Sequence, residues 1–181
     1  MAKYKLTKET KNFCGITLHR VKYFDGISGG WIERESNLSQ EGACRVLDNA
    51  QVYGDAQVYG DAQVSGSALV YGYAQVYGSA RVYGSAQVFG CAWVSGSARV
   101  SGSAWVSGSA WVSKATELIC LSGFKFHITV TPQNCAIGCQ MKTHAEWMAV
   151  TKRQAIEMGL PAEEYLDLKA ILKRLFAKVK R

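Results

Sequence analysis

The chain has 181 residues, of which 48% are apolar, so it can bury one substantial core and one main domain is expected. No apolar run approaches the roughly 20 residues that a membrane-crossing helix needs, and the N-terminus lacks the apolar stretch of a secretory signal, so we expect a cytoplasmic protein with no membrane partner. The net charge of +7 lies at the ends, because residues 46–113 carry only two basic and three acidic side chains.

Residues 1–43 contain strand-like stretches at 15–23, 29–33 and 37–39. They stand directly before a strict repeat. The first coil of a repetitive β structure exposes unpaired strand groups and an open core, which must be covered. We therefore predict that residues 1–43 form an N-terminal β cap.

A six-residue repeat fills the centre of the chain. Valine stands at every sixth position from Val46 to Val112, a small residue precedes each valine by two positions, and glycine follows most of them by two. The unit is Ala-x-Val-x-Gly-x. An α-helix would scatter these valines around its cylinder, and each glycine would cost it about 1 kcal/mol relative to alanine. The period therefore predicts short strands joined by glycine corners.

Three units close a coil of 18 residues, and stacked coils pair each strand with the strand above and below it. The fold class predicted is an all-β solenoid, a parallel β-helix of four to five coils over residues 44–132. Leu118, Phe124 and Val130 keep the phase of the valines, and we expect them to extend the helix by a fifth coil.

Outward side chains recur every 18 residues and so fall on three faces. The arginine face carries Arg45, Gln63, Arg81 and Arg99 before the valines, and Leu47, Ser65, Tyr83 and Ser101 after them. The first aromatic face carries Tyr53, Tyr71, Phe89 and Trp105. The second aromatic face carries Tyr59, Tyr77, Trp93 and Trp111.

Arg45, Arg81 and Arg99 are the candidate ligand-binding residues. Guanidinium groups one or two coils apart can hold phosphate or a carboxylate-rich partner, whether a small molecule or a host protein. Alternatively, they only keep this face soluble. We do not expect nucleic acid as a partner, because the chain has no recognised DNA-binding motif.

The aromatic residues have three interpretations. Rings on successive coils can stack on one another and stabilise the repeat. They can also form the interface of a homo-oligomer, because exposed apolar patches of this extent are usually covered. A platform for carbohydrate or nucleic-acid bases is the third. We interpret them chiefly as an interface.

Residues 133–181 are predicted to form a C-terminal cap with two helices. Thr143 and Glu146 have the spacing of a capping box, so a helix should begin there and run to about Glu157. A second helix should follow Pro161 and end near Lys180. Its apolar stripe must pack on the β-helix or on a sister subunit, and it consists of Tyr165, Leu168, Ile171, Leu172, Leu175, Phe176 and Val179.

No metal or cofactor is predicted. Cys135 and Cys139, with His127 and His144 nearby, match a zinc site only weakly, and spacing fixes no fourth ligand. The six cysteines are irregularly spaced in a chain without an export signal, so we expect free thiols. Neither a phosphate-binding P-loop nor a dinucleotide-binding fingerprint is present.

The repeat resembles the hexapeptide-repeat superfamily of left-handed parallel β-helices, although its glycine follows the valine by two positions instead of one. The resemblance implies left-handed coils, a trimer and, in many members, acyl transfer with a catalytic histidine. No histidine and no inserted loop interrupt residues 46–117, so no catalytic residue is assigned, and His127 and His144 are weak candidates only.

The flanks are similar to those of small uncharacterised hexapeptide-repeat proteins of bacteria and prophages. The similarity rests on Gly29–Glu33 and Asn37–Ser39 before the repeat, and on Ile137–Cys139, His144, Glu146 and Trp147 after it. We therefore predict a non-catalytic binding protein that presents a rigid surface to an anionic ligand or a host macromolecule, for example to sequester a nucleotide or to inhibit a defence protein. The alternative is an acyltransferase with its active site between subunits.

Overall fold

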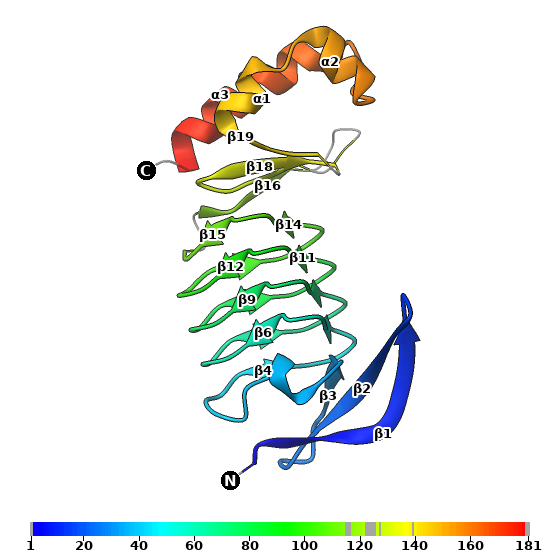
Figure 1. Ribbon diagram of the computed structural model, residues 1–181. Helices are drawn as coiled ribbons and strands as arrows, with labels where there is room; N and C mark the ends of the chain where they lie inside the picture. Colours follow the sequence, from blue (N-terminus) through cyan, green and yellow to red (C-terminus); the bar gives the residue numbers. More distant parts are fainter. Residues whose placement is uncertain (1, 115–116, 122–125, 127, 139, 180–181) are drawn as a thin grey trace.

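The computed structural model describes residues 2–114, 117–121, 126, 128–138 and 140–179. An N-terminal β-hairpin lies at one end of an elongated molecule, a stack of coils forms its middle, and a small sheet with helices closes the other end (Figure 1).

Two-residue strands recur every six residues through the stack. They are β4 (Arg45–Val46), β5 (Gln51–Val52), β6 (Gln57–Val58), β7 (Gln63–Val64), β8 (Leu69–Val70), β9 (Gln75–Val76), β10 (Arg81–Val82), β11 (Gln87–Val88), β12 (Trp93–Val94), β13 (Arg99–Val100), β14 (Trp105–Val106) and β15 (Trp111–Val112). Every third strand belongs to the same parallel sheet, so the orders are β4-β7-β10-β13, β6-β9-β12-β15 and β5-β8-β11-β14. The predicted β-solenoid, of about five coils, is confirmed.

The valines and the small residues before them fill the interior. From Val46 to Val112 each valine is 0% exposed, and each pairs in register with the valine 18 residues away. The corner glycines adopt left-handed backbone, with φ of +71° at Gly72 as an example. They also stack closely, because a Cβ on Gly72 would lie 3.1 Å from the nitrogen of Gly90. At Gly72 and the other corners that lie against the next coil, glycine is therefore favoured both by conformation and by space.

The N-terminal segment consists of β1 (Tyr4–Phe13), β2 (Ile16–Tyr23), β3 (Ser28–Ile32) and the short 3-10 helix η1 (Glu35–Asn37). β1 and β2 form an antiparallel hairpin, and β3 continues it but also pairs in parallel with β5. Leu38 pairs in parallel with Val58. Residues from β3 onward therefore contribute walls to the first coil, while the hairpin of β1 and β2 lies beside the coils, where Phe13 meets Tyr53.

The C-terminal part begins with a four-stranded antiparallel sheet in the order β16 (Ile119–Leu121), β17 (Ile128–Val130), β18 (Asn134–Ile137) and β19 (Gln140–Thr143). Leu118 still packs against the solenoid core, but Val130 belongs to this sheet and to a second core. The expected extension of the parallel coils through Val130 was wrong, because these strands are long enough to pair with each other in hairpins. Phe124 lies outside the described residues.

Three helices cover this sheet: α1 (His144–Ala149), α2 (Lys152–Glu157) and α3 (Glu164–Val179). The single helix predicted up to Glu157 is two helices, because Thr151 forms a second capping box with Gln154. The apolar stripe of α3 packs on the antiparallel sheet and α1, where Leu172 and Phe176 are buried with Ile128. The prediction that it packs on the coils of the solenoid was wrong, and contact with a sister subunit stays a prediction.

The last coil ends with backbone N–H groups that have no further coil to bind. In the stack each wall N–H donates to the following coil, as Gln87 does to the Ala104 carbonyl at 2.8 Å. At the end, Trp105 N–H donates to Thr129 Oγ1 at 3.1 Å and Ser113 N–H to Glu117 Oε2 at 2.7 Å. Side-chain oxygens therefore replace the missing coil, which prevents further strand addition.

Candidate functional site

The arginine face brings Arg81 and Arg99 side by side. Arg81 of β10 and Arg99 of β13 are direct partners in register on neighbouring parallel strands, and both side chains are exposed. Among the described residues, no carboxylate lies within 4 Å of either guanidinium. Like charges that stand opposite each other on adjacent strands destabilise a sheet. The pair is therefore an unrelieved positive site that an anion would stabilise.

An open groove of about 220 Å³ lies over this pair, lined by Gln63, Ser65, Arg81, Tyr83 and Arg99. Each residue lies one coil from its neighbour or two positions along the same strand, so the groove follows directly from the 18-residue period. Gln63, Ser65 and Tyr83 could be assigned to the face from sequence, but not to a binding role. The available signal was a serine on each side of Tyr83, at positions 65 and 101.

Arg45 lies on the same sheet but is engaged elsewhere. Its guanidinium pairs with Asp25 and lies 4.8 Å from the centre of the Tyr23 ring. The hydrogen bond from Arg45 holds the pKa of Asp25 below its usual value. Arg45 therefore fastens the N-terminal hairpin to the first coil, and the structure does not bring it to the groove with Arg81 and Arg99.

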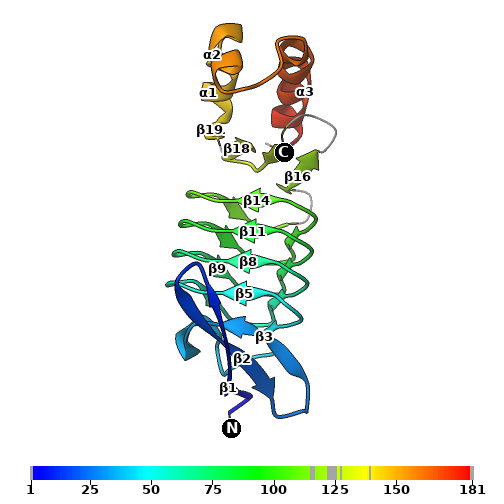
Figure 2. The ribbon, with the colours of Figure 1, turned by 90° about the vertical axis from the view of Figure 1, so that its right-hand side faces the viewer.

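The first aromatic face is a stacked column. The ring centres of Tyr53 and Tyr71 are 5.1 Å apart and those of Tyr71 and Phe89 are 5.0 Å apart, with nearly parallel planes. Phe13 of the hairpin covers the lower end at 5.8 Å from Tyr53, and Trp105 meets Phe89 edge-on. Figure 2 shows the hairpin lying over this side of the solenoid. Burial raises the pKa of Tyr53 to about 12. Stacking and the hairpin thus cover much of this face.

The second aromatic face is stacked at one end and open at the other. Tyr59 and Tyr77 stack with ring centres 4.9 Å apart. Trp93 and Trp111 meet edge-on at 6.4 Å and keep 44% and 53% of their surface exposed. This tryptophan pair is the part of the predicted interface that remains uncovered within one chain.

His144 has a packing role in the C-terminal core. It is 7% exposed, its ring stacks on Phe176 with centres 4.0 Å apart, and Nε2 lies 2.8 Å from the Thr131 carbonyl oxygen. A carbonyl oxygen only accepts, so Nε2 carries the proton. A buried ring held in this way is poorly placed for general-base catalysis. His127, the other weak catalytic candidate, lies outside the described residues.

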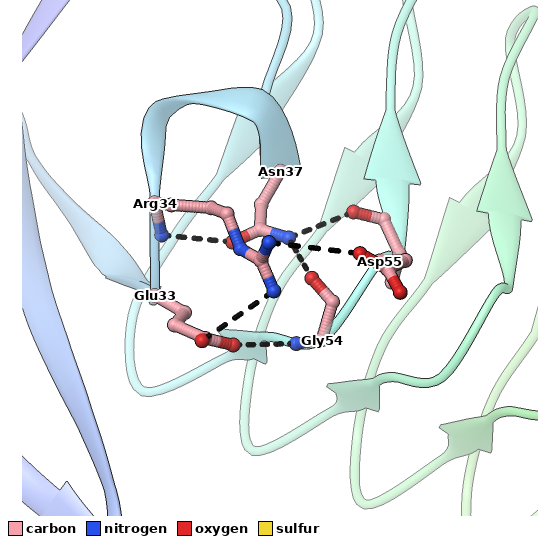
Figure 3. A network of polar contacts seen from close by, with 6 residues as sticks. Glu33, Arg34, Asn37, Gly54 and Asp55 are labelled. Carbon is pink, nitrogen blue, oxygen red and sulfur yellow. Dashed lines mark hydrogen bonds and ion pairs between the residues drawn. The ribbon is translucent and has the colours of Figure 1, made fainter.

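The residues of the N-terminal motif form a polar network at the first corner (Figure 3). Asn37 is 1% exposed and donates to the carbonyls of Gly54 and Ala56, both at 2.9 Å. Glu33 accepts from the Gly54 N–H at 2.7 Å, and Arg34 lies 3.6 Å from Asp55. The polar groups of this network are hydrogen-bonded or ion-paired to one another, and they fasten the N-terminal segment to the second coil. The network is therefore structural.

The C-terminal motif is also structural. The Trp147 indole donates to the Cys135 carbonyl at 2.7 Å, and Glu146 accepts from the Thr143 N–H at 2.8 Å to close the capping box.

Within the described part of the chain, no group of three potential metal ligands occurs. The described cysteines are free, namely Cys14, Cys44, Cys91, Cys120 and Cys135. Among the helices that the structure describes, none has the length and apolar character to span a bilayer.

Comparison with known proteins agrees with the repeat. No curated protein matches the chain in sequence. Residues 56–72 and 74–90 match the family model described as the YdcK beta solenoid repeat. These two segments each cover nearly one coil and include Gln63, Ser65, Arg81 and Tyr83 of the groove. In its central coils, the chain is therefore similar to the YdcK beta solenoid repeat.

Proposed function

We propose that the protein is a non-catalytic binding protein whose arginine face holds an anionic ligand. The observation that carries this proposal is the in-register pair of Arg81 and Arg99, which lacks an acidic partner among the described residues. Two guanidinium groups about one strand spacing apart, roughly 4.8 Å, can bind neighbouring oxygens of one phosphate or of a diphosphate.

The neighbouring coils provide a matched replacement. Glutamine occupies the position of Arg81 and Arg99 in Gln51, Gln57, Gln63, Gln75 and Gln87. The exchange of Arg81 and Arg99 for glutamine therefore removes both charges with a side chain that this wall position already accepts.

The test is binding of inorganic pyrophosphate, measured by titration calorimetry at low ionic strength. We expect binding that weakens with salt and falls at least about tenfold in the Arg81→Gln/Arg99→Gln variant. Arg153→Gln is the control, because Arg153 is exposed on α2 and pairs with Glu157. Mass spectrometry of small molecules released from the purified, denatured protein would identify the natural ligand. Unchanged affinity in the double variant would reject the site.

The anionic partner could also be an acidic surface of a host protein, as inhibition of a defence protein would require. The groove favours a small molecule, because its two free arginines lie one coil apart and Arg45 is withdrawn. An acyltransferase remains the less supported alternative, since His144 packs against Phe176. The acyltransferase alternative would be supported if the protein transferred an acyl group from coenzyme A and if His144→Ala lost this activity while it still folded.

Self-association is a further part of the proposal, with a trimer expected from the resemblance to hexapeptide-repeat proteins. The exposed pair of Trp93 and Trp111 supports it, because paired exposed indoles are usually covered by a partner. Light scattering after size exclusion should give a trimer that dissociates in Trp93→Gln/Trp111→Gln. A monomer at all concentrations would reject this part of the proposal.

A further inference from the structure

Among the described residues, Tyr83 has no aromatic neighbour on the next coil, whereas the tyrosines of the two aromatic faces stack on one another. On the aromatic faces, Tyr53 lies below Tyr71 at 5.1 Å, and Tyr59 lies below Tyr77 at 4.9 Å. The residues at the same position one coil below and above Tyr83 are Ser65 and Ser101. Among the described residues, no aromatic ring packs against Tyr83, which is 39% exposed.

The serine below Tyr83 leaves room for a planar group. Ser65 and Tyr83 both line the open groove. A flat ring placed over Ser65 would lie against Tyr83 as Tyr53 lies against Tyr71, and would complete the missing step of an aromatic column. The amide of Gln63, on the same side of the same coil as Ser65, is in position to bind the polar edge of such a ring.

The charged and aromatic parts of the groove are separated by a short, fixed distance. Arg81 begins β10 and Tyr83 directly follows this strand, two residues further on. In extended backbone, side chains two residues apart emerge on the same side, roughly 7 Å from each other. One sugar ring spans such a gap between a base and its phosphates. Arg99, one coil above Arg81, adds a second guanidinium for a second phosphate.

We infer that the ligand is a nucleoside diphosphate or a larger nucleotide. Its base stacks on Tyr83 over Ser65, and its phosphates bind Arg81 and Arg99. This inference rests on the proposed function, because it uses the same arginine pair, but it adds the aromatic half of the site.

The experiment compares ADP, GDP, UDP and CDP with inorganic pyrophosphate by titration calorimetry. Stacking of one base on an aromatic side chain strengthens binding by about 5- to 150-fold, so at least one nucleotide should bind about tenfold or more tightly than pyrophosphate. Tyr83→Leu should reduce nucleotide affinity about tenfold and leave pyrophosphate within about twofold. Tyr83→Phe should keep the affinity for both. Tyr73→Leu is the control, because Tyr73 is 65% exposed and lies outside the groove.

A second variant fills the space instead of removing the ring. Ser65→Tyr places a tyrosine where the aromatic faces already carry one, so it should fold and stack on Tyr83. It should block nucleotide binding and preserve pyrophosphate binding. If the four nucleotides bind no more tightly than pyrophosphate and Tyr83→Leu has no effect, the inference is overturned while the anion site stands. If neither pyrophosphate nor any nucleotide binds, both proposals fail.

Discussion

Replacing Arg81 by glutamine should stabilise the protein while it weakens anion binding. Arg81 and Arg99 are in-register neighbours without an acidic partner among the described residues, so removing one charge relieves a repulsion. With the guanidinium groups about one strand spacing apart, roughly 4.8 Å, the repulsion is about 0.9 kcal/mol in water. Screening reduces it to about 0.5 kcal/mol at 0.1 M salt and to about 0.2 kcal/mol at 1 M, which is within the error of additivity.

The measurement is a double-mutant cycle of urea unfolding with Arg81→Gln, Arg99→Gln and the double variant, at about 10 mM and about 1 M NaCl. Each single variant should gain stability at low salt, and the second exchange should add little. The coupling between the two positions should vanish at high salt. A loss of stability that does not depend on salt would refute the reasoning, because it would mean that the arginine stems contribute packing that outweighs their charge.

Three further predictions concern the solenoid and its ends, each measured by urea unfolding. Gly72→Ala should lower the free energy of unfolding by about 1–2 kcal/mol because of the left-handed backbone, and by a further amount because its Cβ would press on the next coil. Gly102→Ala should lose only the backbone contribution, because a Cβ there meets nothing within 4 Å. Equal losses in the two variants would contradict the close stacking of the corners. Asn37→Ala should cost about 2–4 kcal/mol, because two backbone carbonyls lose a buried donor, and a loss below about 0.5 kcal/mol would show that water replaces the amide. Burial acts to raise the pKa of Glu117, but the hydrogen bonds it accepts outweigh burial and hold the pKa below its usual value of 4.5. The contribution of Glu117 to stability should therefore be present at neutral pH and be lost as the pH falls from about 4.5 through the lower pKa of the folded state. Glu117→Gln should remove this part of the acid sensitivity. An identical dependence of stability on pH in the variant would count against the role of Glu117 at the end of the last coil.

The solenoid could be predicted from sequence because its period is local and unbroken. Each repeat unit places a valine in the core, and most units place a glycine at the corner. The pairing of Arg81 with Arg99 therefore follows from their separation of 18 residues. The stacked aromatic columns follow in the same way. In these coils, sequence position determines spatial position.

The ends could not be predicted as fully, because their contacts depend on tertiary packing. The four strands from Ile119 to Thr143 leave the six-residue period, and they pair antiparallel in a sheet that shares its core with the helices. Arg45 has the same repeat position as Arg81, yet Asp25 withdraws it from the groove. Asp25 reaches it only because the N-terminal hairpin folds back beside the first coil.

The side-chain oxygens at the end of the last coil also limit how such a chain can change in length. Thr129, Gln133 and Glu117 each meet a particular wall or corner of the final coil. Duplication of 18 residues would add one coil and return every one of these groups to an equivalent position. Duplication of six residues would turn the end of the stack by a third of a revolution, so that each oxygen would face the wrong wall. Evolution or design can therefore lengthen this protein readily only in whole coils.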